Sequence, residues 1–516
     1  MLVKAYSFAL QGLKGITITI EVSMRAAGHE FHLIGLADAA IKESYDRIRA
    51  VMDNTGYKFP KADITINLSP ADLQKRGSGY DLPIAIGILT AFGYVSPERL
   101  SEVMLVGELG LDGNIQPVKG ALIGAILARK EKYKALIVPE QNAHEAAVVN
   151  NLEVYGMTNL VEVVQFLNGS DQFQPTIVDT RKNFYDQQLS FDLDFADVRG
   201  QEFAKRAIEI CAAGGHNLIM VGPPGSGKSM LAKRIPTILP PMTLAESLET
   251  TQIHSVAGKL DHDSTLIAHR PFRSPHHSIS SVALVGGGTN PQPGEISLAH
   301  NGVLFCDELP EFSRSVLELL RQPLEDRVIS INRANYSVDY PCSFIFVAAM
   351  NPCPCGHYGD RTHKCHCLPG QIIRYMNKIS GPLLDRIDLH CEIQAVPFAE
   401  LSQMKPGESS AVIRERVVAA RKIQEERYRL FKGIHCNAMM TERMLHEFAE
   451  PDAQSLDMLR MAMEKLKLSA RAYSRILKVA RTIADLAGSE QVQAMHIAEA
   501  IGYRNLDRSD WAERGI

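Results

Sequence analysis

Hydrophobic and polar residues follow two kinds of pattern over positions 1–168. Alternation or short apolar runs, which are typical of strands, occur at 15–22, 64–68, 104–107 and 135–138. Helical spacing occurs at 38–55, 82–92, 120–130 and 162–167. Strands interspersed with helices predict an α/β domain over residues 1–168.

The pattern changes twice further along the chain. Residues 169–193 are polar, aperiodic and interrupted by Pro175, which predicts an interdomain linker; an ordered connecting arm is the alternative. Strands and helices alternate again over 194–395, whereas 396–516 is helical. The helices expected there are 411–431, 441–448, 453–465, 470–487 and 494–501. The expected fold class is a multidomain α/β chain with a helical C-terminal domain.

Composition agrees with an ordered protein of several domains. The chain has 516 residues, of which 45% are hydrophobic and 22% charged. At about 100–200 residues per domain, this length suggests roughly three domains. No apolar run reaches the roughly 18–20 residues of a membrane span, and Gln11 and Lys14 interrupt the N-terminal segment, unlike in a signal peptide. We therefore expect a cytoplasmic protein with no membrane partner.

Charge and cysteine content narrow the expected partners. The formal net charge is −4, so binding to nucleic acid would require a local group of basic side chains. Nine cysteines is an odd number, and four of them lie within 353–367. Reduced thiols with one metal site fit this distribution better than a disulfide framework.

A phosphate-binding motif, GPPGSGKS, lies between a short apolar strand and a helical stretch at 230–235. This is the strand–loop–helix context of a P-loop, in which backbone N–H groups and a helix N-terminus surround phosphate oxygens. We expect Lys228 to reach the β- and γ-phosphates of ATP and Ser229 to bind Mg²⁺. The expected nucleotide-binding residues are Gly222, Pro223, Pro224, Gly225, Ser226, Gly227, Lys228 and Ser229.

Polar residues end the next two apolar strands. The strand in 302–308 ends in Asp307, expected to hold Mg²⁺ through water, and Glu308, expected to orient and deprotonate the attacking water. The strand 343–350 ends at Asn351, which would position the same water or satisfy its own turn before Pro352.

Hydrolysis also needs positive charge where negative charge develops in the transition state. Arg386, in SGPLLDRID, and Arg471, at the start of a C-terminal helix, are the candidates. Ordinary surface ion pairs are the alternative for both arginines.

The order of these motifs resembles that of AAA+ ATPases, and more narrowly the ComM/YifB family of the magnesium-chelatase-like branch. The matching segments are 195–235, 269–288, 294–312, 348–356 and 380–390, with 77–89 and 107–121 in the N-terminal part. The resemblance implies an AAA+ P-loop α/β core over 194–395, with a Cys-rich insert at 353–367, and a helical lid over 396–516. It also implies a hexameric ring, in which Arg386 completes the neighbouring subunit's site and Arg471 acts from the lid.

The resemblance further implies a function on DNA. ComM-type proteins are ATP-driven helicases that promote branch migration in natural transformation, so single-stranded or branched DNA is the expected partner. Two inserts of this clade face the ring pore and correspond here to 324–340 and roughly 268–290. The candidate DNA contacts are Arg270, Arg273, Arg327 and Arg333, because a few basic residues per subunit suffice in a ring.

Two other functions stay open. One is the ATPase motor of a magnesium chelatase, against which the N-terminal domain argues because chelatase motor subunits lack it. The other is a protein-remodelling complex or ATP-dependent protease. The N-terminal domain resembles the ribosomal-S5-like fold of Lon proteases, but the positions of the Lon Ser–Lys dyad align with Tyr80-Asp81 and Leu122 here. Ser78 and Lys119 are the remaining dyad candidates.

Two Cys-x-Cys pairs, Cys353 with Cys355 and Cys365 with Cys367, could supply four thiolates to a tetrahedral Zn²⁺. Replacement ligands could come from His357, His363 or His366, and a metal-free thiol cluster or redox pair is the alternative. A second motif, His276-His277, is less favourable for a metal, since adjacent residues of one strand point to opposite faces.

Overall fold

The structure is a computed structural model. It describes residues 2–25, 28–260, 265–288, 291–333, 336–360, 363–394, 406–466, 468–504 and 506. The chain divides into two compact units, Met1–Asp186 with Leu244–Ala268, and Gln187–Thr243 with His269–Ile516. The segment Leu244–Ala268, which lies within the expected ATPase core, is therefore part of the first unit.

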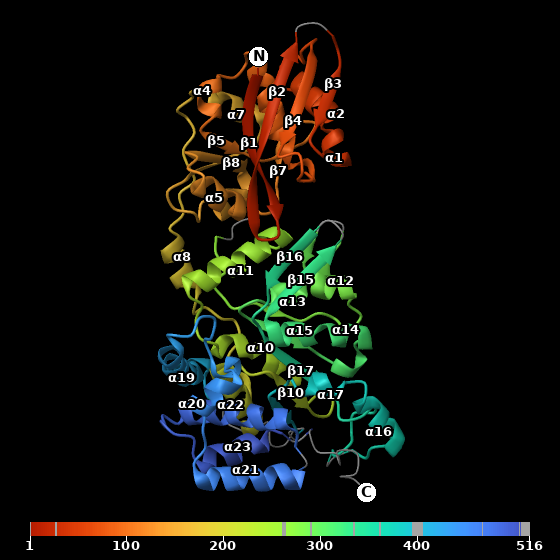
Figure 1. The fold of residues 1–516 in the computed structure, drawn as a ribbon, viewed down its shortest axis with the longest axis vertical. Coiled ribbons are helices and arrows are strands. Elements are labelled where there is room, and N and C mark those ends of the chain that lie inside the picture. Colours follow the sequence, from red (N-terminus) through yellow and green to blue (C-terminus); the bar gives the residue numbers. More distant parts are fainter. Residues whose placement is uncertain are drawn as a thin grey trace. The chain divides into compact units, whose positions relative to one another are not determined.

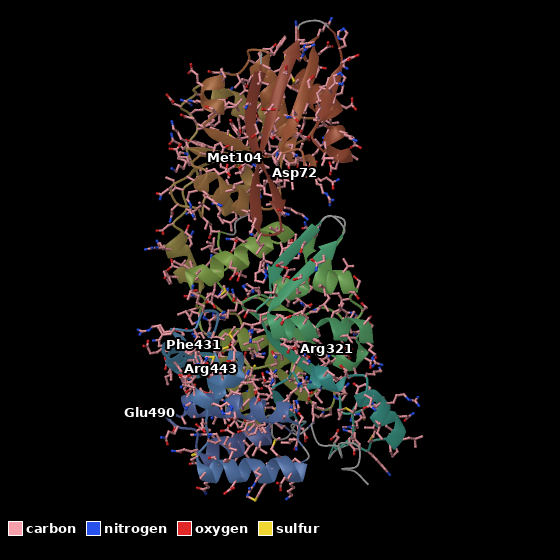
Figure 2. All side chains as sticks on the ribbon, in the orientation of Figure 1. Asp72, Met104, Arg321, Phe431, Arg443 and Glu490 are labelled. Atoms are coloured by element: carbon pink, nitrogen blue, oxygen red, sulfur yellow. The ribbon has the colours of Figure 1, made fainter. Side chains whose placement is uncertain are left out.

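The first unit contains a mixed seven-stranded sheet in the order β3-β4-β2-β1-β5-β8-β9 (Figure 1). Its strands are β1 (Leu2–Gln11), β2 (Lys14–Arg25), β3 (Phe31–Ile34), β4 (Asp63–Ser69), β5 (Val103–Leu105), β8 (Ala135–Pro139) and β9 (Glu153–Met157). β6 (Glu108–Leu109) and β7 (Ile115–Gln116) form a separate small hairpin. Met104 of β5, labelled in Figure 2, is fully buried. The expected strands are therefore confirmed as parts of β2, β4, β5 and β8.

Helices α3 (Asp81–Ala91) and α5 (Ala121–Lys130) pack on this sheet because their apolar residues need a partner surface, and α11 (Leu244–Ala257) packs on α5. The other helices of this part of the chain are α1 (Ala39–Lys42), α2 (Ser44–Asn54), α4 (Pro97–Leu100), α6 (Ala143–Ala146), α7 (Leu160–Leu167) and α8 (Thr180–Gln187). Helix α3 is buried on nearly all sides, and a Cβ added to Gly87 would lie 2.7 Å from Cγ2 of Val22. Glycine thus lets α3 approach β2 closely.

The segment expected to be a linker contains a helix. Within 169–193 the chain forms α8, where Phe184 is 2% exposed and its ring lies 5.2 Å from that of Tyr185. The polar composition does not predict this helix, because Phe184 is its one buried residue. The boundary between the two units, after Asp186, lies within 169–193, and the assignment of this segment as an interdomain linker or an ordered arm stays a prediction.

The second unit contains an all-parallel sheet of five strands in the order β11-β14-β17-β10-β18. Its strands are β10 (Leu218–Val221), β11 (Phe272–Arg273), β14 (Val303–Cys306), β17 (Ile345–Met350) and β18 (Leu389–Glu392). Strands β10, β14 and β17 are buried along their whole length, as expected for a sheet covered on both faces. The carboxyl ends of these strands meet at one edge, where ligands of open α/β sheets bind.

Shorter elements and a helical C-terminal part complete this unit (Figure 1). The helices are α9 (Glu202–Gly214), α10 (Lys228–Ile238), α12 (Ser281–Val285), α13 (Glu295–Leu298), α14 (Arg314–Leu319), α15 (Arg321–Asp326), α16 (Pro369–Met376), α17 (Gly381–Leu384), α19 (Ser410–Tyr428), α20 (Glu442–Phe448), α21 (Ala453–Leu466), α22 (Ala470–Leu486) and α23 (Ala494–Gly502). The paired short strands are β12 (Gly286–Gly287) with β13 (Gln292–Pro293), and β15 (Val328–Arg333) with β16 (Tyr336–Pro341). The helical spacing after residue 410 is confirmed by α19 to α23, and one hydrophobic core joins these helices to the sheet. None of the described helices has both the length and the apolar character needed to cross a membrane.

Candidate functional site

The loop between β10 and α10 has the backbone of a phosphate-binding loop. Gly225 and Gly227 have φ angles of 76° and 89°, in the left-handed region that glycine enters without strain. A Cβ added to Gly222 would lie 2.3 Å from the backbone oxygen of Ile393, so only glycine fits there. The three glycines thus shape the loop, and α10 begins at Lys228 with its N-terminal N–H groups next to it.

Lys228 lies within this loop and is mostly buried. Its Nζ donates to the backbone oxygens of Gly222 (2.7 Å) and Pro223 (2.9 Å), and it lies 3.3 Å from Oδ1 of Asn351. Burial lowers the pKa of Lys228, and the nearby carboxylates of Asp307 and Glu308 partly offset this effect. The ammonium group is therefore held at the strand ends, where it can meet a phosphate.

The two residues expected to bind Mg²⁺ are in direct contact. Ser229 Oγ donates to Oδ2 of Asp307 at 2.6 Å, although 78 positions separate them in the sequence. Strand β14 ends at Cys306, so Asp307 lies at the same edge of the sheet as the P-loop. A hydroxyl and a carboxylate are hard oxygen ligands of the kind that Mg²⁺ prefers, so this pair fits the ion.

Glu308 has an unusual backbone conformation. Its φ is 52°, a left-handed value that costs free energy for a residue with a Cβ and is concentrated at functional sites. Its carboxylate is 58% exposed, and Oε2 lies 3.5 Å from Nδ1 of His277. The carboxylate is therefore accessible beside the P-loop, as a general base requires.

His277 was missed as a site residue, because the sequence argument placed His276 and His277 on one strand. That expectation is wrong: both residues follow the end of β11, in a turn, and their rings lie 4.0 Å apart. A turn removes the alternation of side chains that a strand imposes. The sequence signal for this position is weak: His277 follows Pro275 by two residues and precedes the strand that ends at Asp307 and Glu308.

Asn351 directly follows β17 and contacts the P-loop lysine, as described above. Its backbone amide also faces the hydroxyl of Tyr375 in α16, whose pKa is raised by burial. The structure thus brings Asn351 together with Lys228, whereas its contact with a water molecule stays a prediction. Tyr375 is a second residue that sequence reasoning missed, because no motif marks it.

The two candidate arginines lie near each other but pair outside the P-loop. Arg386 forms an ion pair with Glu325 at the end of α15 and donates to the backbone oxygen of Pro382 at 2.7 Å. This pairing with Arg386 lowers the pKa of Glu325. Arg471 Nη1 lies 3.2 Å from Oδ2 of Asp385. The expected role of Arg386 in a neighbouring subunit's site and that of Arg471 from the lid both stay predictions.

Asp388 connects the sheet to the helical part. It is 1% exposed, accepts from the backbone N–H of Asn217 at 2.9 Å, and forms an ion pair with Arg475 of α22 at 2.8 Å. His216 Nδ1 lies 3.5 Å away, and its Nε2 contacts Thr482 of α22 at 2.7 Å. Burial would raise the pKa of Asp388, but Arg475 and these neighbours outweigh it and keep the pKa well below its usual value.

Replacing Asp388 by alanine is expected to destabilise this unit by about 3–5 kcal/mol, because the buried carboxylate that pairs with Arg475 is lost. Urea unfolding of the full chain measures this change. The control is Asp385→Ala, which removes the half-buried partner of the exposed Arg471 and should cost about 0–1 kcal/mol. Equal effects of the two variants would contradict the role assigned to Asp388.

Three of the four candidate DNA-binding arginines make contacts within the chain. Arg270 donates to the backbone oxygens of Pro240 and Asn301, and Arg273 forms a bidentate pair with Glu295 at 2.6 and 2.7 Å. Arg327, at the base of the β15–β16 hairpin, donates to Ser343 Oγ at 2.9 Å. Arg333 ends β15, and its side chain lies outside the described residues. The hairpin expected in 324–340 is confirmed, and its contact with DNA stays a prediction.

In the first unit, the residues considered for a protease dyad have other partners. Ser78 Oγ donates to the carboxylate of Glu108, and Leu122 is fully buried in α5. Asp81 is buried in a pair with Arg47, whose Nε lies 2.9 Å from Oδ2. Lys119 packs against Gly258, where an added Cβ would lie 2.8 Å from its Cε. These contacts do not assemble a serine–lysine pair at Ser78.

The four loop cysteines, by contrast, come together. Their sulfur atoms lie within 4.8 Å of one another, and a separate group contains His357, Asp360 and His363. Both histidines contact Oδ2 of Asp360, at 3.1 and 3.3 Å, and His366 belongs to neither group. The sulfur group is thus complete without a histidine ligand.

A P-loop at the end of β10, with acidic residues at the end of β14 of the same parallel sheet, defines an AAA+-type nucleotide-binding protein. Three family models match the chain. "Magnesium chelatase, subunit ChlI" matches residues 194–401, "Subunit ChlI of Mg-chelatase" matches 20–142, and "Magnesium chelatase, subunit ChlI C-terminal" matches 407–504. Together these matches extend over both units.

Known proteins of similar length identify the family more closely. The chain is 46% identical over 505 residues to Competence protein ComM of Haemophilus influenzae, covering 98% of this chain and 97% of that protein. It is 43% identical over 504 residues to YifB of Escherichia coli, covering 97% and 96%. The chain therefore belongs to the ComM/YifB family of magnesium-chelatase-like proteins. A partial similarity, 29% over 157 residues, links 28% of the chain to Lon protease 2 of Bacillus subtilis and covers 27% of that protein.

Proposed function

We propose that this chain is a Mg²⁺-dependent ATPase that forms a hexameric ring and moves along DNA as a helicase, promoting branch migration in the cytoplasm. The contact between Ser229 and Asp307, beside the buried Lys228, is the observation that carries the ATPase part. It joins the phosphate-binding loop to an acidic strand end, which is the arrangement that phosphoryl transfer from a nucleoside triphosphate requires.

The residues at this edge supply the separate requirements of hydrolysis. The P-loop N–H groups and Lys228 bind the phosphates, and bound Mg²⁺ would neutralise charge on them. Glu308 accepts a proton from the attacking water, while Asn351 orients that water or holds Lys228 in place. Arg386 from the next subunit and Arg471 from the lid would stabilise the charge of the transition state.

The DNA part rests on family membership and on the hairpin. The similarity to Competence protein ComM extends over nearly the whole chain, so the same architecture serves both proteins. The β15–β16 hairpin carries exposed polar residues, including Ser330 and Asp339, and Arg333 lies at the end of β15. A ring would present one such hairpin per subunit, and repeated weak contacts with a phosphate backbone add up.

Replacing Arg333 by alanine should weaken DNA stimulation of ATP hydrolysis and displacement of a strand from a three-way junction. Each arginine that contacts phosphate adds about one to the slope of log affinity against log salt, so this slope should fall by about one per contact. The matched control is Arg460→Ala, which removes a 70% exposed arginine from α21. A chain that stays monomeric with saturating ATP and ignores DNA would contradict the proposal.

The matched family models favour one second candidate, the motor of a metal-inserting chelatase. One of these models, for a subunit of magnesium chelatase, covers residues 20–142 of the N-terminal part. The N-terminal domain therefore does not argue against a chelatase motor, contrary to the expectation from the sequence. The two functions differ in the partner that stimulates ATP hydrolysis. A branched DNA should raise the ATPase rate of a helicase and leave the rate of a chelatase motor unchanged.

A further inference from the structure

The loop after Asn351 gathers four cysteines in one place. Cys353 is fully buried, and Cys355, Cys365 and Cys367 are half-buried. The sulfur atoms of Cys353 and Cys355 lie 3.4 Å apart, and each lies 3.7 and 3.6 Å, respectively, from that of Cys365. Four sulfurs bound to one ion at 2.3 Å lie about 3.8 Å apart in a regular tetrahedron. The observed spacing is therefore close to that of a tetrahedral metal site.

Backbone donors around the sulfurs suit negatively charged thiolates. The N–H of Cys367 lies 3.4 Å from Sγ of Cys365. The backbone amides of His357 and His366 also face Sγ of Cys355. Such hydrogen bonds stabilise charge on sulfur and orient the ligands of a metal. The nine cysteines of the chain are all unpaired, which leaves these four free for an ion.

We propose that Cys353, Cys355, Cys365 and Cys367 bind one Zn²⁺ ion. Binding converts four thiols into four thiolates and releases four protons, which gives the site a net charge of −2. Sulfur ligands in a tetrahedron select zinc among the common divalent ions, and a site closed by four protein ligands is structural. The ion would give the loop a core that its polar side chains do not provide.

This site lies directly against the nucleotide-binding loop. Cys353 is two positions after Asn351, and Gly356, with φ of 86°, packs on Pro224. A Cβ added to Gly356 would lie 2.6 Å from Cδ of Pro224 and 3.9 Å from Cγ of Asn351. Zinc would therefore fix the loop that supports both Pro224 and Asn351, and the four cysteines act as positioning residues for hydrolysis. This second step rests on the proposed ATPase function.

Metal analysis of the full chain, purified without an affinity tag that binds metal, tests the site itself. We expect about one Zn²⁺ per chain. Addition of a mercurial reagent should release that zinc as the four thiolates react. Cys355→Ser and Cys365→Ser should lose the ion, whereas Cys436→Ala, which removes a buried cysteine elsewhere, should keep it. Less than about half an equivalent of zinc, or an equivalent of iron in its place, would overturn the assignment.

The link to hydrolysis is tested separately with Cys355→Ser and with zinc-stripped wild type. We expect kcat to fall on the order of 10-fold, as for residues that orient others, with a smaller change in KM. Returning Zn²⁺ should restore kcat in the stripped protein. An unchanged kcat after verified zinc loss would overturn the coupling. A wild type that contains zinc but hydrolyses no ATP would instead contradict the proposed function and leave the metal site intact.

Discussion

Glu308→Gln is expected to reduce ATP hydrolysis by about 10²–10⁴-fold, the contribution typical of a general base. Glutamine keeps the shape of the side chain but cannot accept the proton from water. Binding of ATP should persist, because Lys228 and the Ser229–Asp307 pair are unchanged. Steady-state turnover and equilibrium binding of a fluorescent ATP analogue measure the two quantities on the same sample.

The matched control for this variant is Glu311→Gln. Glu311 lies three positions further on, is 46% exposed and pairs with Lys378, so its charge is similar but it lies away from the P-loop lysine. This control should retain nearly full turnover. If Glu308→Gln also hydrolyses ATP at nearly the wild-type rate, Glu308 is not the base.

Arg386→Ala should reduce turnover even more, by about 10³–10⁵-fold, if its guanidinium completes the site of the adjoining subunit as an arginine finger. Within its own chain Arg386 pairs with Glu325, so Glu325→Ala is the control that removes this ion pair and keeps the arginine. Glu325→Ala should retain most of the activity. Single-turnover hydrolysis in preformed rings separates the chemical step from assembly.

Mixing two inactive variants distinguishes action between subunits from action within one. Lys228→Ala lacks a working P-loop but carries Arg386, whereas Arg386→Ala has an intact P-loop. Mixed rings should regain part of the activity, because some interfaces combine both intact halves. If mixed assemblies form and stay inactive, Arg386 acts within its own chain and the shared site is wrong.

The chemistry of the P-loop region was predictable because short contiguous motifs encode it. The glycines that allow left-handed backbone, and the residues directly after buried strands, are set by local sequence. The contact between Ser229 and Asp307 then follows from the parallel sheet, which brings strand ends together. The same reasoning gives the expected strands and the helices of the C-terminal part.

Features that depend on distant packing were not predictable. Helix α8 depends on burial of Phe184, and its local sequence is mostly polar. His277, which lies beside Glu308, and its neighbour His276 follow β11 in a turn that no local pattern marks. Arg273, expected to face DNA, has the carboxylate of Glu295 22 positions later as its partner, which only the folded chain reveals.

The chain passes from one unit to the other three times, because Leu244–Ala268 belongs to the first unit whereas the residues before and after it belong to the nucleotide-binding unit. Within the first unit, the hydroxyl of Ser255 in this segment donates to the buried carboxylate of Glu145. The backbone N–H of Gly120 donates to the backbone oxygen of Ser255 at 3.2 Å. The N-terminal part is therefore not a detachable module. A single cleavage between Asp186 and Leu244 would separate the N-terminal part from α11. A fragment ending near residue 186 would therefore expose the surface that α11 covers.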